Sequence, residues 1–339
     1  MGAASIDLEG KSILITGGTG SFGKAFASHV LKNVRSVRLA IFSRDEQKQF
    51  EFANTLSEEE QAKARFFIGD VRDASRLSMA MRNVDYVVHA AALKIVPTAE
   101  YNPFECIQTN VVGAENVVRA AIEQNVKRVI ALSTDKACNP INLYGASKLA
   151  SDKIFVAANH LAGAHGPRFA VVRYGNVIGS RGSVLPFFRD LIAKGAKDLP
   201  ITDTRMTRFW IAVEQGVEFV LSCFAISRGG EIFVPKIPSM RVVDLAQALA
   251  PGVPHRVIGI RPGEKLHEVM ISRDDARNTV DLGDRYVIEP ATHLWDKQRR
   301  SFLADGGKQV EEGYEYASDT NKEWLSAKDL HRLAAGISA

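Results

Sequence analysis

Short apolar runs alternate with longer helical stretches through the first half of this 339-residue chain. The runs are almost continuously apolar and lack the strict alternation of a sheet that faces water on one side. Apolar strands separated by helices pack as a parallel sheet, because the crossover helices cover both of its faces. We therefore predict a doubly wound α/β fold, with strands at residues 12–16, 38–42, 65–69, 85–92, 128–133 and 168–173. Helical periodicity predicts helices at residues 103–125, 144–161 and 213–225.

The composition argues against several classes of protein. The net charge is only +4, and no basic run is interleaved with aromatic residues as a nucleic-acid platform would be. No window approaches the ~18 consecutive apolar residues of a membrane span. Cys106, Cys138 and Cys223 are scattered and form neither a metal-binding nor a disulfide pattern. We therefore expect a cytoplasmic protein that binds no nucleic acid, membrane or metal.

The segment TGGTGSFG follows the first predicted strand and opens a helix. Gly17, Gly20 and Gly23 permit a tight turn and a close approach of the backbone to a pyrophosphate, while the helix N-terminus supplies N–H donors. An ordinary strand-to-helix turn is the alternative. The position of the glycines at the first strand-to-helix junction favours a dinucleotide site and a Rossmann fold.

The residues after the second predicted strand indicate which dinucleotide binds. NAD-binding chains usually carry an acidic residue there for the ribose 2′-hydroxyl, whereas this chain has Ser43 and Arg44, which suit a 2′-phosphate. Lys48, one helical turn beyond Arg44, is a candidate for further support. We therefore predict NADP. The alternatives are a solvated arginine beside a capping serine, and some use of NAD because Asp45 is also present.

The third strand and the rest of the chain complete the predicted organisation. Asp70 and Val71 fall where the adenine ring would lie, although Asp70 could instead cap a helix. We predict that residues 1–178 form an NADP-binding Rossmann domain. Residues 179–339 are predicted to be mainly a smaller substrate-binding region, with segments free to return to the Rossmann sheet. This second part also carries strand-like runs at residues 231–235 and 256–260.

Tyr144 and Lys148 form a Y-x-x-x-K pair on one face of a predicted helix. A neighbouring ammonium favours the phenolate form of a tyrosine, so Tyr144 can take a hydroxyl proton during hydride transfer while Lys148 lowers its pKa and holds the nicotinamide ribose. Ser133 or Thr134 can supply a hydroxyl donor beside the tyrosine. Such a pair is common by chance, but its place after the fifth strand of a Rossmann pattern gives it weight.

Asp135 and Lys136 directly follow these hydroxyls, at the sheet edge where α/β proteins bind ligands. A simple alcohol dehydrogenase needs no adjacent carboxylate and amine. Elimination of water needs one group to remove a proton next to a carbonyl and another to protonate the departing hydroxide. The alternative is that Asp135 caps a turn and Lys136 is solvated.

With these motifs in place, nearly the whole chain resembles the inverting UDP-N-acetylglucosamine 4,6-dehydratases of the extended short-chain dehydrogenase/reductase family. The resemblance rests on long strings, among them TGGTGSFGK, FSRDE, FFIGDVRD, HAAALK, ALSTDKA, NPINLYGASK, ITDTRMTRFW and IGIRPGEKLHEVM. It implies UDP-N-acetylglucosamine as substrate, NADP as cofactor and a homo-oligomer.

The resemblance also implies roles for individual residues. The catalytic residues would be Thr134, Asp135, Lys136, Tyr144 and Lys148. NADP would contact Tyr144 and Lys148. It would also contact Gly17, Thr19, Gly20, Ser21, Phe22, Gly23, Ser43, Arg44, Lys48, Asp70, Val71 and Ala91. The UDP-sugar would contact Lys94, Asn176, Arg181, Arg261 and Glu264, although the last two could instead be surface charges.

At the positions of Asp135 and Lys136, retaining members of the family look to have an Asp-Glu pair instead. The lysine in this chain resembles the inverting members and suggests inversion at C5. In the implied reaction Tyr144 deprotonates the C4 hydroxyl, Lys136 removes H5, and Asp135 helps to expel the C6 hydroxyl. The product would be UDP-2-acetamido-2,6-dideoxy-β-L-arabino-hex-4-ulose, which resembles the entry point to pseudaminic acid. Two residues depart from the family pattern, Ile95 and Cys138, and we expect them to alter packing only.

Three other functions fit part of this pattern. A UDP-hexose 4-epimerase shares the glycine turn and the Y-x-x-x-K pair but loses no water. A retaining 4,6-dehydratase would keep the configuration at C5. An NADP-sensing regulator could be built on the same fold without turnover.

Overall fold

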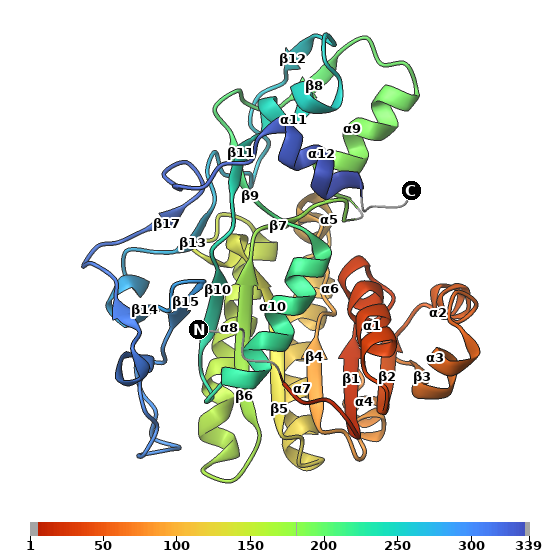
Figure 1. The fold of residues 1–339 in the computed structure, drawn as a ribbon, viewed down its shortest axis with the longest axis vertical. Coiled ribbons are helices and arrows are strands. Elements are labelled where there is room, and N and C mark those ends of the chain that lie inside the picture. The colour runs from red at the N-terminus through yellow and green to blue at the C-terminus, as the bar shows by residue number, and fades with distance from the viewer. Residues whose placement is uncertain (1–5, 181, 336–339) are drawn as a thin grey trace.

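A computed structural model describes residues 6–180 and 182–335 of the chain. Its centre is a ten-stranded sheet in the order β16-β14-β15-β10-β6-β5-β4-β1-β2-β3 (Figure 1). The strands from β10 to β3 are all parallel, which confirms the predicted doubly wound fold. Their bounds are β1 Lys11–Thr16, β2 Val37–Ser43, β3 Ala64–Ile68, β4 Tyr86–His89, β5 Arg128–Thr134, β6 Arg168–Tyr174 and β10 Ile232–Pro235.

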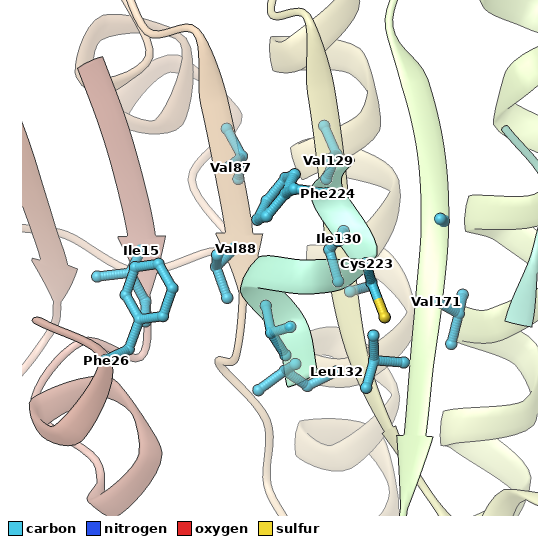
Figure 2. Packing of buried hydrophobic residues seen from close by; sticks show 14 of the residues in the cluster. Ile15, Phe26, Val87, Val88, Val129, Ile130, Leu132, Val171, Cys223 and Phe224 are labelled. Atoms are coloured by element: carbon cyan, nitrogen blue, oxygen red, sulfur yellow. The ribbon is translucent and has the colours of Figure 1, made fainter. Parts of the chain in front are cut away.

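Helices cover both faces of this sheet. In the view of Figure 1, α1 (Ser21–Asn33) and α10 (Val213–Ile226) lie in front of the strands, and α4 (Ala74–Ala80), α7 (Gly113–Glu123) and α8 (Leu143–Ala162) lie behind them. Figure 2 shows Phe26 of α1 and Phe224 of α10 against strand residues such as Ile15 and Val129. These side chains belong to one continuous buried apolar cluster, so the sheet and its front helices share a core.

The strand order reverses between β1 and β4, because the chain continues to β2 on one side and to β5 on the other. Ligands of open α/β sheets bind outside the carboxyl ends of the strands at such a reversal. The predicted cofactor and catalytic residues follow these carboxyl ends. Smaller helices complete this half: α2 Glu46–Ala53, α3 Glu58–Lys63, α5 Val96–Tyr101 and α6 Pro103–Ile107.

Three antiparallel strands extend the sheet at its other edge. β15 (Arg285–Ile288) pairs with β10, and β14 (Thr279–Asp281) and β16 (Lys308–Gln309) follow outward. In Figure 1 they form the blue edge of the sheet, next to the pair β13 (Val269–Ile271) and β17 (Tyr316–Ala317). This part of the chain therefore adds strands to the sheet that the first half begins.

A second cluster of buried apolar side chains lies beyond the carboxyl ends of the parallel strands, at the top of Figure 1. Its centre includes Phe188, Trp210 and Leu245, which are fully or almost fully buried. The elements around it are β7 Asn176–Val177, α9 Val184–Ala193, β8 Leu199–Ile201, β9 Thr207–Ile211, β11 Ser239–Arg241, α11 Val242–Leu249, β12 His255–Val257 and α12 Ala327–Ala335.

Three predicted elements differ from the structure. The strand expected at 85–92 ends at His89, because the Thr16 hydroxyl accepts the N–H groups of Ala90 and Ala91 and the chain turns there. The strand expected at 256–260 is short because its partner β8 ends at Ile201. The helix expected at 103–125 contains a π-helical turn at Gln108–Val112.

None of the helices in the described part of the chain has the length and apolarity that a membrane crossing requires.

Candidate active site

The glycine turn between β1 and α1 is shaped for close backbone contacts. Gly17 has a φ of 67°, and a Cβ there would lie 2.8 Å from the Ala91 nitrogen. A Cβ at Gly23 would lie 2.4 Å from the Gly17 carbonyl oxygen. Helix α1 begins after Gly20, which provides no side-chain cap, and the first turn of the helix carries no acidic residue. The turn thus offers a glycine-lined cradle and a helix N-terminus, and both suit a pyrophosphate.

The predicted 2′-phosphate residues lie at the carboxyl end of β2. The Ser43 hydroxyl is buried and hydrogen-bonds to the Thr19 hydroxyl at 2.7 Å, which ties this strand to the glycine turn. The Arg44 side chain is 60% exposed and lies 3.9 Å from the Asp70 carboxylate. Lys48 forms an ion pair with Asp45. Arg44 is therefore the more available cation for a 2′-phosphate.

The Asp70 carboxylate also forms an ion pair with Arg72. Arg72 donates a hydrogen bond of 2.8 Å to it. Partial burial acts to raise the pKa of Asp70, but the hydrogen bonds and charge of Arg72 prevail and lower it. Val71 is buried and packs against Gly113 of α7, where an added Cβ would lie 2.8 Å from the valine side chain.

The loop after β4 carries Ala91 and Lys94 and is held by a buried asparagine. Asn110, in the π-helical turn, accepts from the Leu93 N–H at 2.8 Å and donates to the Leu93 carbonyl at 2.9 Å. It also donates to the Ser147 hydroxyl of α8 at 2.9 Å. Partial burial and the positive charge of Lys136 lower the pKa of Lys94. Sequence reasoning did not identify Asn110 as the residue that holds this loop.

Tyr144 and Lys148 lie on the buried face of α8, in the first turns of the helix. Burial raises the pKa of Tyr144 to about 12, although the charge of Lys136 and the neighbouring Thr134 hydroxyl act to lower it. Lys136 therefore adds a positive charge that acts on the tyrosine, and the effect expected of Lys148 on the pKa of Tyr144 stays a prediction. Thr134, not Ser133, is the hydroxyl beside Tyr144, because Ser133 donates to Asp152 at 2.7 Å.

Lys148 has a buried carboxylate nearby that sequence reasoning missed. Asp152 lies one helical turn further along α8 and accepts from Arg173 at 3.3 Å. Burial lowers the pKa of Lys148, and Asp152 partly offsets this effect. The spacing of four residues on one helix was a signal for this neighbour that the sequence offered.

Asp135 and Lys136 form an ion pair of 3.0 Å in the short 3₁₀ turn Asp135–Ala137 after β5. Asp135 is fully buried. Its Oδ1 accepts from Thr134 and Lys136, whereas its Oδ2 has no hydrogen-bond partner among the described residues. Lys136 also donates to Asn176 of β7 at 3.3 Å and lies 3.3 Å from Glu268. A carboxylate and an amine thus lie close to Tyr144, and one buried carboxylate oxygen has no hydrogen-bond partner among the described residues.

The segment that contains Arg261 and Glu264 lies over the start of α8. Asn142, the N-cap of this helix, donates to the Gly263 carbonyl at 2.7 Å and accepts from the Gly145 N–H at 2.7 Å. Arg261 and Glu264 lie 3.9 Å apart, and Oε2 of Glu264 is buried without a hydrogen-bond partner among the described residues. Arg181, the remaining predicted substrate ligand, lies outside the described residues.

The two family departures are both placed by the structure. Ile95 is exposed at the start of α5, and Cys138 is buried with its carbonyl bonded to Lys265 at 2.5 Å.

Known proteins resemble this chain over most of its length. Residues 13–290 match the family described as "Polysaccharide biosynthesis protein". The chain is 59% identical over 324 residues to a Campylobacter jejuni protein named UDP-N-acetylglucosamine 4,6-dehydratase (inverting), covering 95% of this chain and 96% of the relative. It is 43% identical to a Rickettsia akari protein named UDP-glucose 4-epimerase, covering 95% of both chains.

Among solved structures, Pen from Bacillus thuringiensis superimposes with a TM-score of 0.86 at 34% identity, covering 97% of this chain and 98% of that one. The chain therefore belongs to the polysaccharide biosynthesis protein family, within the extended short-chain dehydrogenases/reductases that include the inverting UDP-N-acetylglucosamine 4,6-dehydratases.

Proposed function

We propose that this protein is an NADP-dependent UDP-N-acetylglucosamine 4,6-dehydratase that inverts C5 and forms UDP-2-acetamido-2,6-dideoxy-β-L-arabino-hex-4-ulose. The observation that carries the proposal is the buried Asp135–Lys136 pair beside Tyr144, with Asp135 Oδ2 free of partners among the described residues. The high identity to the Campylobacter jejuni relatives supports the same reaction.

The glycine cradle supports the cofactor part of the proposal. A Cβ at Gly17 would clash with the backbone of Ala90 and Ala91, and one at Gly23 with the backbone of Gly17 and Gly18, so glycines keep this turn tight at the helix N-terminus where a pyrophosphate would bind. Arg44 and Ser43 would hold the 2′-phosphate, and Lys148 the nicotinamide ribose. When bound, the nicotinamide accepts a hydride from C4 of the sugar and later returns it to C6.

Tyr144 begins the chemistry by accepting the proton of the C4 hydroxyl. Burial raises its pKa to about 12, so the phenol first releases its own proton to solvent, and the phenolate then takes the hydroxyl proton. The charge of Lys136 favours the phenolate and so assists this proton transfer. Once C4 is a ketone, the hydrogen at C5 becomes acidic.

Asp135 and Lys136 then carry out the elimination. As an ion pair they hold one proton between them, at a hydrogen-bond distance of 3.0 Å. Transfer of this proton from the lysine to the aspartate yields an amine and a carboxylic acid without changing the charge of the site. The Lys136 amine removes H5, and Asp135 protonates the departing C6 hydroxyl as water. C5 then receives a proton from solvent on the opposite face, which inverts its configuration and balances the proton that Tyr144 released.

Incubation of the protein with UDP-N-acetylglucosamine and NADP⁺ in D₂O tests the proposal. We expect a product lighter by one water, about 18 Da before deuterium is counted, because C4 oxidation leads to elimination. NMR should show deuterium at C5 with inverted configuration. A product of unchanged mass would indicate the epimerase, retention at C5 the retaining dehydratase, and no turnover the NADP-sensing regulator.

Substitution of the ion pair tests the residue roles. Lys136→Ala and Asp135→Asn should each lower kcat by about 10²- to 10⁴-fold, the usual contribution of a general acid or base. Lys127→Ala removes an exposed lysine paired with Asp85 and serves as the control, with kcat unchanged. Full turnover by Lys136→Ala would end its assignment as the base.

The biological setting follows from the proposed product. We place the protein in the cytoplasm as a homo-oligomer, at the first step toward pseudaminic acid and the glycosylation of flagellin. The chemical likeness of the product to that sugar supports the pathway step, and the family resemblance supports the homo-oligomer.

A further inference from the structure

Lys136 lies between two carboxylates, and only one of them adjoins it in sequence. Glu268 Oε1 is 3.3 Å from Lys136 Nζ, which also makes the 3.0 Å contact with Asp135. The Glu268 side chain is 2% exposed, and its Oε2 has no hydrogen-bond partner among the described residues. Burying an ionised carboxylate costs free energy unless the carboxylate is paired, and Lys136 is the cation that pairs with Glu268 at the shortest distance.

Glu268 is carried to Lys136 by the same segment that contains Arg261 and Glu264. Two backbone hydrogen bonds fix it: Ser318 Oγ accepts from the Glu268 N–H at 2.9 Å, and the Ser318 N–H donates to the Glu268 carbonyl at 2.8 Å. Lys265 of this segment donates to the Cys138 carbonyl, just past the 3₁₀ turn. The glutamate is therefore held rigidly against the catalytic turn.

Charged groups from several elements lie near the Lys136–Glu268 ion pair. Arg208 of β9 lies 3.8 Å from Glu268 Oε1, and Lys265 lies 3.9 Å from Oε2. The charge of Lys136 also acts on Lys94 of the loop after β4 and on Tyr144 of α8. The two carboxylates, Asp135 and Glu268, thus stand among several cations, and Glu268 is the one that nothing in the proposed steps uses.

We propose that Glu268 is a positioning residue that holds the Lys136 ammonium against Asp135 and sets the pH at which this pair loses its single proton. The inference rests on the proposed function, because that proton is the one the elimination moves. Burial acts to lower the pKa of Lys136, but the charges of Asp135 and Glu268 outweigh burial and raise it. Without Glu268, the proton would be lost at lower pH and the site would lack its acid.

Glu268→Gln tests this role because it keeps the shape of the side chain and removes the charge. We expect the basic limb of the kcat–pH profile to move to lower pH by about one to three units, the usual effect of a nearby opposite charge. KM for the sugar nucleotide should change little. Glu268→Asp keeps the charge but withdraws it by one methylene, so its limb should lie between those of Glu268→Gln and the unaltered protein.

Glu231→Gln is the matched control. Glu231 is fully buried and pairs with Arg299 at 2.8 Å, far from the catalytic turn in sequence. A structural loss should lower Tm in both glutamine variants, whereas only Glu268→Gln should move the pH limb. An unmoved limb in Glu268→Gln, with Tm lowered as in the control, would overturn the proposal.

A second readout does not depend on turnover. The pH midpoint for acetylation of Lys136 by acetic anhydride, followed by peptide mass spectrometry, reports its unprotonated fraction directly. We expect this midpoint to fall in Glu268→Gln and to stay unchanged in Glu231→Gln. If the unaltered protein fails to convert UDP-N-acetylglucosamine, the proposed function fails, and the acetylation midpoint still decides the role of Glu268.

Discussion

Single residues determine the chemistry of this site through the charges next to them. Lys136 and Lys148 are both lysines beside a tyrosine, but Lys136 is held by Asp135 and Glu268 while Lys148 is buried near Asp152. The first arrangement stabilises an ammonium, and the second lowers the pKa of the amine because burial prevails. The sequence identified both lysines, but their protonation depends on partners that come from other segments.

Cofactor preference is a prediction at the same scale. Arg44 is 60% exposed and has a contact of only 3.9 Å with Asp70, so its guanidinium can turn to a 2′-phosphate. Arg44→Ala should raise KM for NADP⁺ about tenfold or more, since a charge-assisted hydrogen bond contributes about 1.5–3 kcal/mol. KM for NAD⁺ should hardly change.

The control for this prediction is Arg119→Ala, which removes an exposed arginine of α7 paired with Glu115. It should alter neither KM. Equal changes in KM for both cofactors in Arg44→Ala would show that Arg44 contributes to binding without selecting NADP⁺.

At the scale of elements, local pattern predicted the strands and helices of the first half closely. β1 and β6 begin within one residue of the expected positions, and α8 covers Leu143–Ala162 where 144–161 was predicted. The errors came where side chains from elsewhere intervene. The Thr16 hydroxyl accepts two backbone N–H groups just after β4, so the strand ends there. The apolar periodicity of 3.6 residues does not distinguish the π-helical turn before α7 from an α-helix.

The strand-to-helix turn after β1 gives a prediction about an element. Gly10 and Gly17 share a φ of 67°, but a Cβ at Gly10 meets nothing within 4 Å, whereas one at Gly17 meets the backbone of Ala90 and Ala91. Gly10→Ala should therefore cost only about 1 kcal/mol of backbone strain. Gly17→Ala adds a clash that displaces the loop.

Thermal unfolding and cofactor titration distinguish the two variants. We expect Gly17→Ala to have the lower Tm and to bind NADP⁺ much more weakly than Gly10→Ala. Similar Tm and Kd values in both would mean that the close approach at Gly17 is unimportant.

At the scale of the whole molecule, the C-terminal part is joined to the sheet by a buried ion network. Arg299 is 3% exposed, donates to Glu231 at 2.8 Å and lies 3.4 Å from Glu289. Glu289 also accepts from the Ser301 hydroxyl at 2.6 Å. These contacts connect the start of β10 and the end of β15 to the chain that follows.

Arg299→Ala should therefore destabilise the protein by about 3–5 kcal/mol, because it leaves buried carboxylates without their partner. Arg300→Ala is the adjacent control: its side chain is 70% exposed and should contribute about 0.5 kcal/mol or less. Denaturant unfolding measures both. Equal losses would show that the buried network does not anchor this part of the chain.

The sequence by itself determined the parallel sheet, the glycine turn, the Tyr144–Lys148 spacing and the Asp135–Lys136 pair. All of these depend on residues within a few positions of one another, where backbone periodicity dictates the geometry. Only the tertiary structure decided that Glu268 would reach Lys136 and that β14, β15 and β16 would extend the sheet. Such contacts join distant segments through burial and charge pairing, which no local pattern encodes.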